Sequence, residues 1–206
     1  MSTMGRALTL LLAGLSWTCG DAPTPEQSPP TPNGVYGQAP AAAQGIPSVV
    51  TLRPSSGGQA APPAVTAVLD QLGLAFTPSR LLVHVGQRIE VVNSESLAHN
   101  VHITFVDDDA IVLLADMVLG ERREVMLDRE GGYDVVCDAH PGMRAFIYMT
   151  SATYAVLADT DGRFVIADVP LGSYTASVWS ADAGFRSERS VEISGSSTEL
   201  DLSGSS

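Results

Sequence analysis

The chain has 206 residues, which is room for one large or two small domains once a targeting segment is removed. Its formal net charge is -12, from 11 Lys+Arg and 23 Asp+Glu, and all 11 of the Lys+Arg residues are arginines. Such a surface repels nucleic acid and anionic lipid head groups, so we expect no nucleic-acid partner and no function that depends on a basic patch. The acidic balance would suit a partner protein with a basic surface, and it would equally suit simple solubility.

The N-terminus has the layout of a signal peptide over residues 1–18. A lone Arg6 precedes an apolar run from Ala7 to Leu15, and small or polar residues follow before Cys19. This apolar run is too short to span a bilayer as a permanent helix. Residues 19–45 are rich in Pro, Gly, Gln, Ala and Ser and lack a periodic apolar pattern, which predicts a disordered tether.

A cysteine at the end of an export signal, followed by such a tether, resembles the start of a bacterial lipoprotein. The resemblance implies that Cys19 carries a lipid. It also implies an exported protein on the periplasmic or other extracytoplasmic face of a membrane, held there through the N-terminal lipid anchor. Cleavage and secretion without a lipid is the alternative interpretation.

From about Ser48 onward, short β-branched and aromatic runs alternate with Gly, Asp, Ser and Pro clusters, and no stretch shows a helical apolar period. The fold class is therefore predicted to be all-β. The first eight strands would make one antiparallel sandwich, assigned to residues 46–150. They are Val49–Arg53, Ala67–Leu69, Leu81–Val85, Arg88–Asn93, Asn100–Phe105, Arg122–Leu127, Tyr133–Cys137 and Arg144–Met149.

A second set of strands is expected in residues 151–206, separated by turns such as Asp159–Gly162. About 50 residues is small for an independent hydrophobic core. We therefore expect this C-terminal module to pack on the first domain or to borrow a strand from it, with the join near Ser151. The predicted strands are Tyr154–Ala158, Arg163–Ala167, Ser173–Ser180, Glu188–Ile193 and Thr198–Leu202.

Candidate metal ligands stand where a predicted strand gives way to a loop. Cys137, His140 and Met143 occupy positions n, n+3 and n+6, so a tight loop can direct the thiolate, the imidazole and the thioether at one point. His99 supplies a second imidazole at the start of an upstream strand. Two histidine nitrogens and one cysteine sulfur with a weak axial methionine are the ligand set of a blue-copper electron-transfer site.

Strand parity selects His99 over its neighbour His102. Side chains alternate between the faces of a strand, so His99 shares the apolar face, whereas His102 faces the other way and is expected at the surface. His84, in a strand far along the chain from the loop, is interpreted as structural. If Cys19 is lipidated, Cys137 has no disulfide partner, and a buried thiol without a metal is the alternative to a metal thiolate.

The four candidate ligands, with Asn93, Asn100 and Tyr133 beside them, resemble the ligand regions of the cupredoxins plastocyanin and amicyanin. The resemblance covers roughly Val65 to Thr150. It implies that Asn100 pins the two ligand loops together and that the protein moves single electrons. It also implies a cupredoxin Greek-key β-sandwich and one mononuclear type 1 copper, held by His99, Cys137, His140 and Met143.

The segment from Tyr154 to Thr175 resembles a carboxypeptidase regulatory-like β module. A plastocyanin-like domain that runs directly into such a module is an arrangement found in a group of bacterial proteins. Despite their name, modules of this kind usually carry no catalytic residues. The resemblance therefore implies a small C-terminal β-sandwich without an activity of its own.

A site closed by four protein ligands leaves no position for a substrate, so we expect an electron carrier and not an enzyme. The electron would leave through His140, where Ala139, Pro141 and Gly142 form a small apolar patch for brief docking of a redox partner protein. Two alternatives stay open. The protein could be a copper-free cell-surface binding or structural β-sandwich, or it could store or deliver copper, although the sequence has no Met-rich tract for that role.

Overall fold

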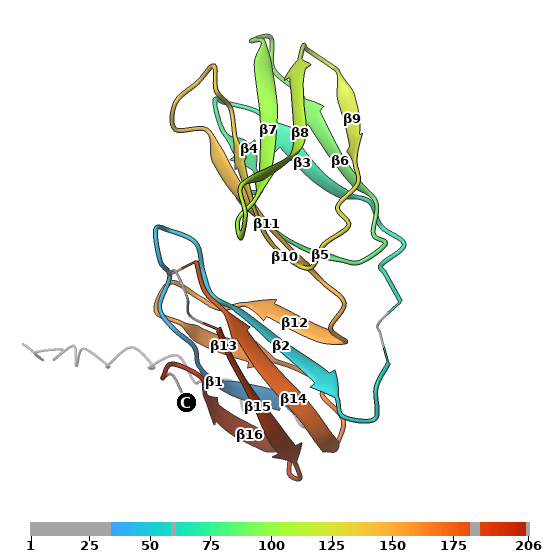
Figure 1. The fold of residues 1–206 in the computed structure, drawn as a ribbon, viewed down its shortest axis with the longest axis vertical. Coiled ribbons are helices and arrows are strands. Elements are labelled where there is room, and N and C mark those ends of the chain that lie inside the picture. Colours follow the sequence, from blue (N-terminus) through green and yellow to red (C-terminus); the bar gives the residue numbers. More distant parts are fainter. Residues whose placement is uncertain (1–33, 59–60, 182–185, 205–206) are drawn as a thin grey trace, which may run out of the picture.

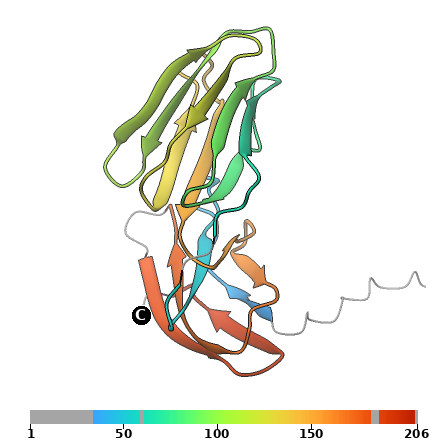
Figure 2. The same cartoon turned by 90° about the vertical axis from the view of Figure 1, so that its right-hand side faces the viewer.

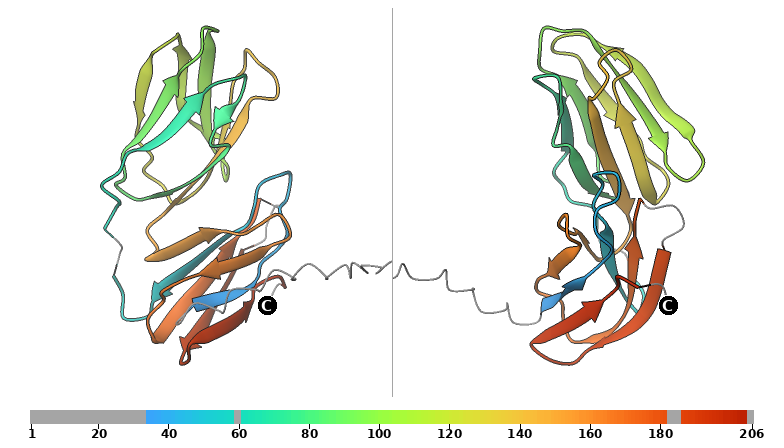
Figure 3. Two further views of the ribbon diagram at one scale, coloured as in Figure 1. Left: turned by 180° about the vertical axis from the view of Figure 1, so that it is seen from behind. Right: turned by 90° about the vertical axis from the view of Figure 1, so that its left-hand side faces the viewer.

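The computed structural model describes residues 34–58, 61–181 and 186–204, and its elements are β-strands arranged as two stacked sandwiches (Figure 1). Views from the side and from behind show the same stacking (Figures 2 and 3). Within these ranges no helix is long and apolar enough to cross a membrane. The all-β prediction is confirmed, whereas the predicted signal peptide, Cys19 and the tether as far as residue 33 lie outside the described residues.

The first sandwich, in the upper half of Figure 1, packs a five-stranded sheet of order β5-β11-β10-β7-β8 against a four-stranded sheet of order β4-β3-β6-β9. Alternating apolar side chains of these strands form its core, in which Leu69, Ile103 and Tyr133 are fully buried. The strands are β3 (Ala67–Gln71), β4 (Phe76–Thr77), β5 (Arg80–His84), β6 (Ile89–Asn93), β7 (His99–Phe105), β8 (Ala110–Met117), β9 (Arg122–Val125), β10 (Gly131–Val136) and β11 (Arg144–Thr150).

The second sandwich, below the first in Figure 1, has sheets of order β12-β2-β14-β15 and β13-β1-β16. It has a core of its own, which includes Leu52, Tyr174 and Ile193. The strands are β1 (Gly34–Gln38), β2 (Val49–Pro54), β12 (Tyr154–Leu157), β13 (Arg163–Ile166), β14 (Gly172–Trp179), β15 (Arg186–Ile193) and β16 (Ser197–Asp201).

The second sandwich takes a middle strand of each sheet from the chain that precedes the first sandwich. β2 lies between β12 and β14, and β1 lies between β13 and β16. The assignment of Val49–Arg53 to a first domain starting at residue 46 is therefore wrong, and so is the extension of a disordered tether to residue 45. The physical reason is that residues 151–206 are too few to close a core alone, so Val35, Val50 and Leu52, all fully buried, complete it.

Two further predictions about the first sandwich need correction. The expected sandwich is antiparallel, but β3 pairs with β6, and β5 with β11, in parallel. These partners are not joined by hairpins, so nothing requires them to reverse direction. β8 is missing from the predicted strands because it is an edge strand with most of its side chains at least partly exposed, which removes a clean alternation.

An aromatic cluster joins the two sandwiches. Trp179, from β14, stacks on Phe146 with 5.1 Å between ring centroids and lies 5.4 Å from the ring of Tyr148, and both of these partners belong to β11. The Trp179 ring also reaches Gly132 in β10, where an added side chain would collide with it. Because the cluster combines side chains of both sandwiches, it fixes one on the other.

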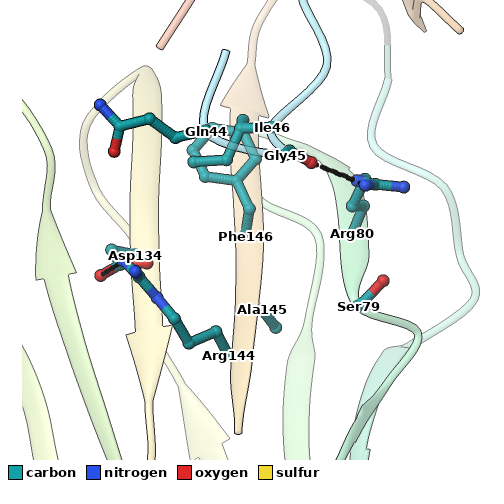
Figure 4. A pocket seen from close by; sticks show the side chains of 9 residues that line it. All are labelled: Gln44, Gly45, Ile46, Ser79, Arg80, Asp134, Arg144, Ala145 and Phe146. Carbon is teal, nitrogen blue, oxygen red and sulfur yellow. Dashed lines mark hydrogen bonds and ion pairs between the residues drawn. The ribbon is translucent and has the colours of Figure 1, made fainter. Parts of the chain in front are cut away.

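Arginine side chains add polar contacts around this interface. Arg53 of β2 binds Glu130, just before β10, with 2.8 Å between Nη2 and the carboxylate oxygen. Arg80 of β5 donates to the Gly45 carbonyl oxygen at 2.6 Å from Nη2, beside a cleft of about 170 Å³ that Figure 4 shows from close by. The second sandwich is therefore attached to the first one by both apolar and polar contacts.

Candidate metal centre

The loop between β10 and β11 lies at the end of the first sandwich that points away from the second one (Figure 1). This loop carries Cys137 and His140, and the start of β7 brings His99 beside them. The Cys137 Sγ atom lies 3.7 Å from the Nδ1 atom of each histidine, and the two Nδ1 atoms are 2.9 Å apart. Three of the predicted donors therefore converge on one point.

The loop from Cys137 to Met143 is closed by its own backbone. The Cys137 N–H donates to the Met143 carbonyl at 3.1 Å, and the Met143 N–H donates to the His140 carbonyl at 3.1 Å. Gly142 has φ = 102°, a conformation that strains any other residue, so the turn requires glycine there. The Met143 side chain is buried in the same core cluster as Cys137, which places the fourth predicted donor on the inner side of the loop.

His99 is buried, and a carboxylate contacts the ring nitrogen that faces away from Cys137. Only 3 % of the His99 surface is exposed, and His99 pairs with Met117 of β8. The Glu95 carboxylate lies 2.7 Å from His99 Nε2, which leaves Nδ1 to face Cys137. Sequence reasoning missed Glu95, and the signal that could have found it is its position four residues before His99.

Asn93, the last residue of β6, fixes the segment that leads to His99. Its Nδ2 donates to the carbonyl oxygens of Leu97, at 2.9 Å, and Met117, at 3.0 Å. Its Oδ1 accepts from the Glu95 N–H at 3.0 Å. Because Asn93 is fully buried, these hydrogen bonds define the conformation of the turn and carry Glu95 to its place behind His99.

Asn100 ties β7 to the loop that follows β10. Its Oδ1 accepts from the Asp138 N–H at 2.7 Å, and its Nδ2 donates to the Asp138 carboxylate at 2.7 Å. This is the kind of link between the two ligand segments that the cupredoxin resemblance implies for Asn100. The Asn100 amide, and after it His102, hold the pKa of the Asp138 carboxyl below its usual value.

The two remaining histidines of the described chain stand apart from the three donors. His102 is partly exposed on the outer side of β7, with Nδ1 3.3 Å from the Asp138 carboxylate. His84 lies in β5, where its backbone N–H donates to the Gln87 side chain at 3.1 Å. Neither belongs to the convergent donor group found among the described residues.

The donor set has the chemistry that copper requires. One thiol and two imidazole nitrogens converge, and a buried thioether lies in the same cluster as the thiol. Such a mixture of soft and intermediate ligands suits both Cu(I) and Cu(II). Cys137 is a free cysteine with 3 % of its surface exposed. A thiol that only filled space in the core would have no need of two inward-facing imidazoles.

Comparison with known proteins agrees with this chemistry. Residues 63–150, which include all the strands of the first sandwich, match the family described as copper binding proteins, plastocyanin/azurin family. The plastocyanins of Ulva arasakii and Ulva pertusa are each 35% identical to this chain over 82 residues, covering 35% of this chain and 82% of each plastocyanin. The chain belongs to the plastocyanin/azurin family. Its cofactor is copper, and His99, Cys137 and His140 form a group that can bind one type 1 copper ion.

Solved structures of cupredoxins are also similar to this plastocyanin/azurin-family chain. Amicyanin from Paracoccus versutus is 21% identical, with a TM-score of 0.37, over 48% of this chain and 97% of the amicyanin chain. A purple cupredoxin from Nitrosopumilus maritimus is 20% identical, with a TM-score of 0.36, over 40% of this chain and 98% of its own. The family match itself leaves out β1, β2 and every strand from β12 onward, so it concerns the first sandwich.

Proposed function

We propose that the protein is a one-electron carrier of the blue-copper type. In this proposal His99, Cys137, His140 and Met143 hold one type 1 copper ion, which supplies the Cu(II)/Cu(I) couple when it is bound. The observation that carries the proposal is the convergence of the Cys137 Sγ with the two histidine Nδ1 atoms at a loop closed by hydrogen bonds. A ligand set of this kind serves electron transfer.

The proposed ligands are held in different ways, which gives them different roles. Cys137 follows the last residue of β10 and is tied to Met143 through the backbone. His99 is buried and held by Glu95, whereas His140 is partly exposed on its loop. We assign His140 as the ligand through which electrons enter and leave. Four side-chain ligands leave no position for a substrate, which supports a carrier and not an enzyme.

Exposed apolar side chains surround this end of the first sandwich. The turns next to the site carry several that are roughly half exposed or more, namely Leu72, Leu74, Leu97, Val118 and Leu119. Their turns adjoin His99, because Glu95 binds the Leu74 N–H and because Met117, beside Val118, pairs with His99. An apolar rim supports brief docking of a redox partner protein, and the net charge of -12 favours a partner with a basic surface.

A visible absorption spectrum of the chain without its predicted signal peptide, recorded after addition of Cu(II), tests the proposal. We expect an intense thiolate-to-copper band that a mild reductant bleaches, because Cu(I) has a filled d shell. Cys137→Ser should abolish the band, whereas His102→Gln should keep it, since His102 lies outside the donor group. A colourless wild-type protein that binds no stoichiometric copper would contradict the proposal and favour a copper-free binding or structural protein.

Met143→Leu tests the fourth ligand. We expect the blue band to survive on the other three donors, and the reduction potential to rise, because loss of the sulfur destabilises Cu(II) more than Cu(I). Leucine preserves the volume, so the free energy of unfolding should change by less than about 1.5 kcal/mol. The control is Met149→Leu, which alters an equally buried methionine elsewhere in the same core. Equal potentials in the two variants would remove Met143 from the ligand set.

Copper storage or delivery is the weaker alternative. A storage protein binds several metal ions, whereas the described part of the chain contains a single convergent group of His, Cys and acidic donors. The copper titration separates the two functions by stoichiometry. One copper per chain supports the carrier, and a larger number with a weak blue band supports storage.

We further propose that the protein is exported and held at the periplasmic or another extracytoplasmic membrane face by a lipid on Cys19. The layout of residues 1–45 supports this proposal. The described chain begins with β1 in the second sandwich, and the loop of Cys137 lies at the opposite end of the molecule (Figure 1). That arrangement would direct the copper end away from the anchor, with the second sandwich, proposed to be a carboxypeptidase regulatory-like module, as a support between them. Cys19→Ser should release the protein from the membrane fraction, and unchanged membrane association would contradict the anchor.

A further inference from the structure

We infer that Glu95 is a positioning residue of the copper centre, whose carboxylate keeps His99 Nδ1 directed at the metal position and favours the Cu(II) state. The inference rests on the proposed function, because it assigns a role to a residue behind one proposed ligand. Glu95 touches the centre through His99 and is not itself one of the converging donors.

Three contacts fix the Glu95 carboxylate. Its Oε1 lies 2.7 Å from His99 Nε2 and accepts from the Leu74 N–H at 3.1 Å, and its Oε2 accepts from the Gly73 N–H at 3.2 Å. The Glu95 side chain is 15 % exposed, and the His99 side chain is fully buried. If the carboxylate moved away, the buried imidazole nitrogen and the two backbone N–H groups would lose their hydrogen-bond acceptor. These contacts therefore hold the carboxylate and the imidazole in place together.

This contact selects one form of the His99 ring. A neutral imidazole carries its proton on one nitrogen and a lone pair on the other. The Glu95 carboxylate is a hydrogen-bond acceptor, so the proton stays on Nε2, and Nδ1 keeps the lone pair that a copper ion needs. Within the described residues, the ring of His140 contacts His99 and Cys137 but has no carboxylate partner of this kind. One imidazole of the centre is therefore clamped, and the other is not.

The charge of the Glu95 carboxylate also favours Cu(II) over Cu(I). A carboxylate that accepts from a ligand imidazole makes the metal-facing nitrogen more basic. A more basic nitrogen and a nearby negative charge stabilise Cu(II) more than Cu(I), so they lower the reduction potential.

Glu95 also connects the ligand to the surface beside it. The turn that it binds presents Leu72 and Leu74, which are 52% and 50% exposed, and Leu74 has φ = 57°. Loss of the carboxylate would release this turn as well as His99. The same side chain thus links the orientation of a buried ligand with part of the apolar rim.

The first experiment reads the His99 ring in the copper-free protein by 15N NMR. We expect His99 to be the Nε2-protonated tautomer in the wild type and in Glu95→Gln, whose amide oxygen can still accept from Nε2. Glu95→Ala should lose this preference. An unchanged tautomer in Glu95→Ala would overturn the inference, and because no copper is present, this result is independent of whether the proposed function holds.

The second experiment measures copper. Glu95→Ala should weaken Cu(II) binding about 10- to 100-fold and Cu(I) binding less, which raises the reduction potential. Glu95→Gln should raise the potential with a smaller loss of affinity, because it removes the charge and keeps an acceptor. Glu90→Gln, which removes a carboxylate paired with Arg122 in the neighbouring strand, is the control and should leave both quantities unchanged. Potentials of the Glu95 variants equal to that of Glu90→Gln would overturn the inference.

Discussion

The two ends of the first sandwich use the same strands but are built from different kinds of contact. At the copper end, β10 leads into Cys137, and polar side chains such as Asn93 and Asn100 bind the backbone of neighbouring loops. At the other end, Gly132 of β10 and the aromatic side chains of β11 lie against Trp179 of the second sandwich. The first end is held by directed hydrogen bonds, whereas the second combines an aromatic cluster with polar contacts such as the ion pair between Arg53 and Glu130.

Because of this difference, the geometry of the site and the stability of the whole chain depend on different residues. Buried hydrogen bonds fix donor atoms with little contact area, and they leave a rim of exposed leucines open to a partner. An aromatic cluster buries more apolar area, so it contributes more to the free energy of unfolding. The surface that it buries is not accessible to a partner. Gly132 lies in β10 and Cys137 directly follows the end of that strand, so the two are five residues apart, roughly 17 Å in a strand. Substitutions at the two ends should therefore act independently.

Trp179→Ala should have the largest effect on stability. Its ring contacts Phe146, Tyr148 and Gly132 across the interface, so truncation removes a large apolar contact and leaves a cavity. We expect a loss of about 3–5 kcal/mol in the free energy of unfolding, measured in urea. The visible spectrum of the copper-loaded protein should stay unchanged, because the ring lies at the other end of β10.

The control for Trp179→Ala is Leu171→Ala, which truncates a leucine of the second sandwich that is 60% exposed. Exposed apolar side chains contribute little, so this variant should change the free energy of unfolding by less than about 0.5 kcal/mol. A loss of the blue band in Trp179→Ala under conditions where the chain is still folded would break the comparison, since it would show that the two ends are coupled.

The copper end could be predicted from the sequence because its chemistry restricts both residue type and spacing. Cys137 and His140 lie three positions apart, so a single turn brings them together. His99 is distant in the chain, but strand parity places it on the apolar side, where the structure has it. Few other residues could serve as soft metal ligands, so the sequence offered few alternative ligand sets.

The parts that sequence reasoning missed depend on contacts between distant segments. Glu95 and Asp138 are carboxylates of a kind usually found at surfaces, and only their partners in the fold give them a role. β1 follows a Pro-rich segment and contains Gly37, where a side chain would collide with the Leu200 carbonyl of β16. No local pattern predicts that such a strand completes a sheet more than 120 residues further along the chain.

Tyr148→Phe sharpens the comparison through pH. Burial, and after it the charge of Glu130, raises the pKa of Tyr148 to about 12. In the unfolded chain the phenol ionises near pH 10, so above that pH the unfolded state binds fewer protons, and stability falls until the folded pKa is reached. This group alone should cost up to about 2–3 kcal/mol between pH 10 and 12. Tyr148→Phe should show a correspondingly shallower loss in urea unfolding at alkaline pH.

The control for this titration is Tyr36→Phe, which alters a tyrosine that is 39% exposed. It should follow the wild-type curve between pH 10 and 12. If Tyr148→Phe followed that curve as well, the phenol would not have the partly buried position in the interface that the structure gives it. Copper is left out of this experiment so that the interface is measured by itself.

Asn100→Ala probes the copper end and should have the smallest effect. The change removes the acceptor of the Asp138 N–H and a donor to its carboxylate, so the two ligand segments lose a direct link. We expect the affinity for Cu(II) to fall about tenfold, which corresponds to about 1.4 kcal/mol, with little change in urea unfolding of the copper-free chain. Competition against a chelator of known affinity measures this change.

His102→Gln is the matched control, because His102 contacts the Asp138 carboxylate but leaves its backbone N–H bonded to Asn100. If the link between the two segments positions the ligands, this variant should lose clearly less copper affinity than Asn100→Ala. Equal losses would mean that the environment of the Asp138 carboxylate matters and the backbone link does not. An unaltered affinity in Asn100→Ala would show that the hydrogen bonds around Asn93 and Glu95 hold the copper end without it.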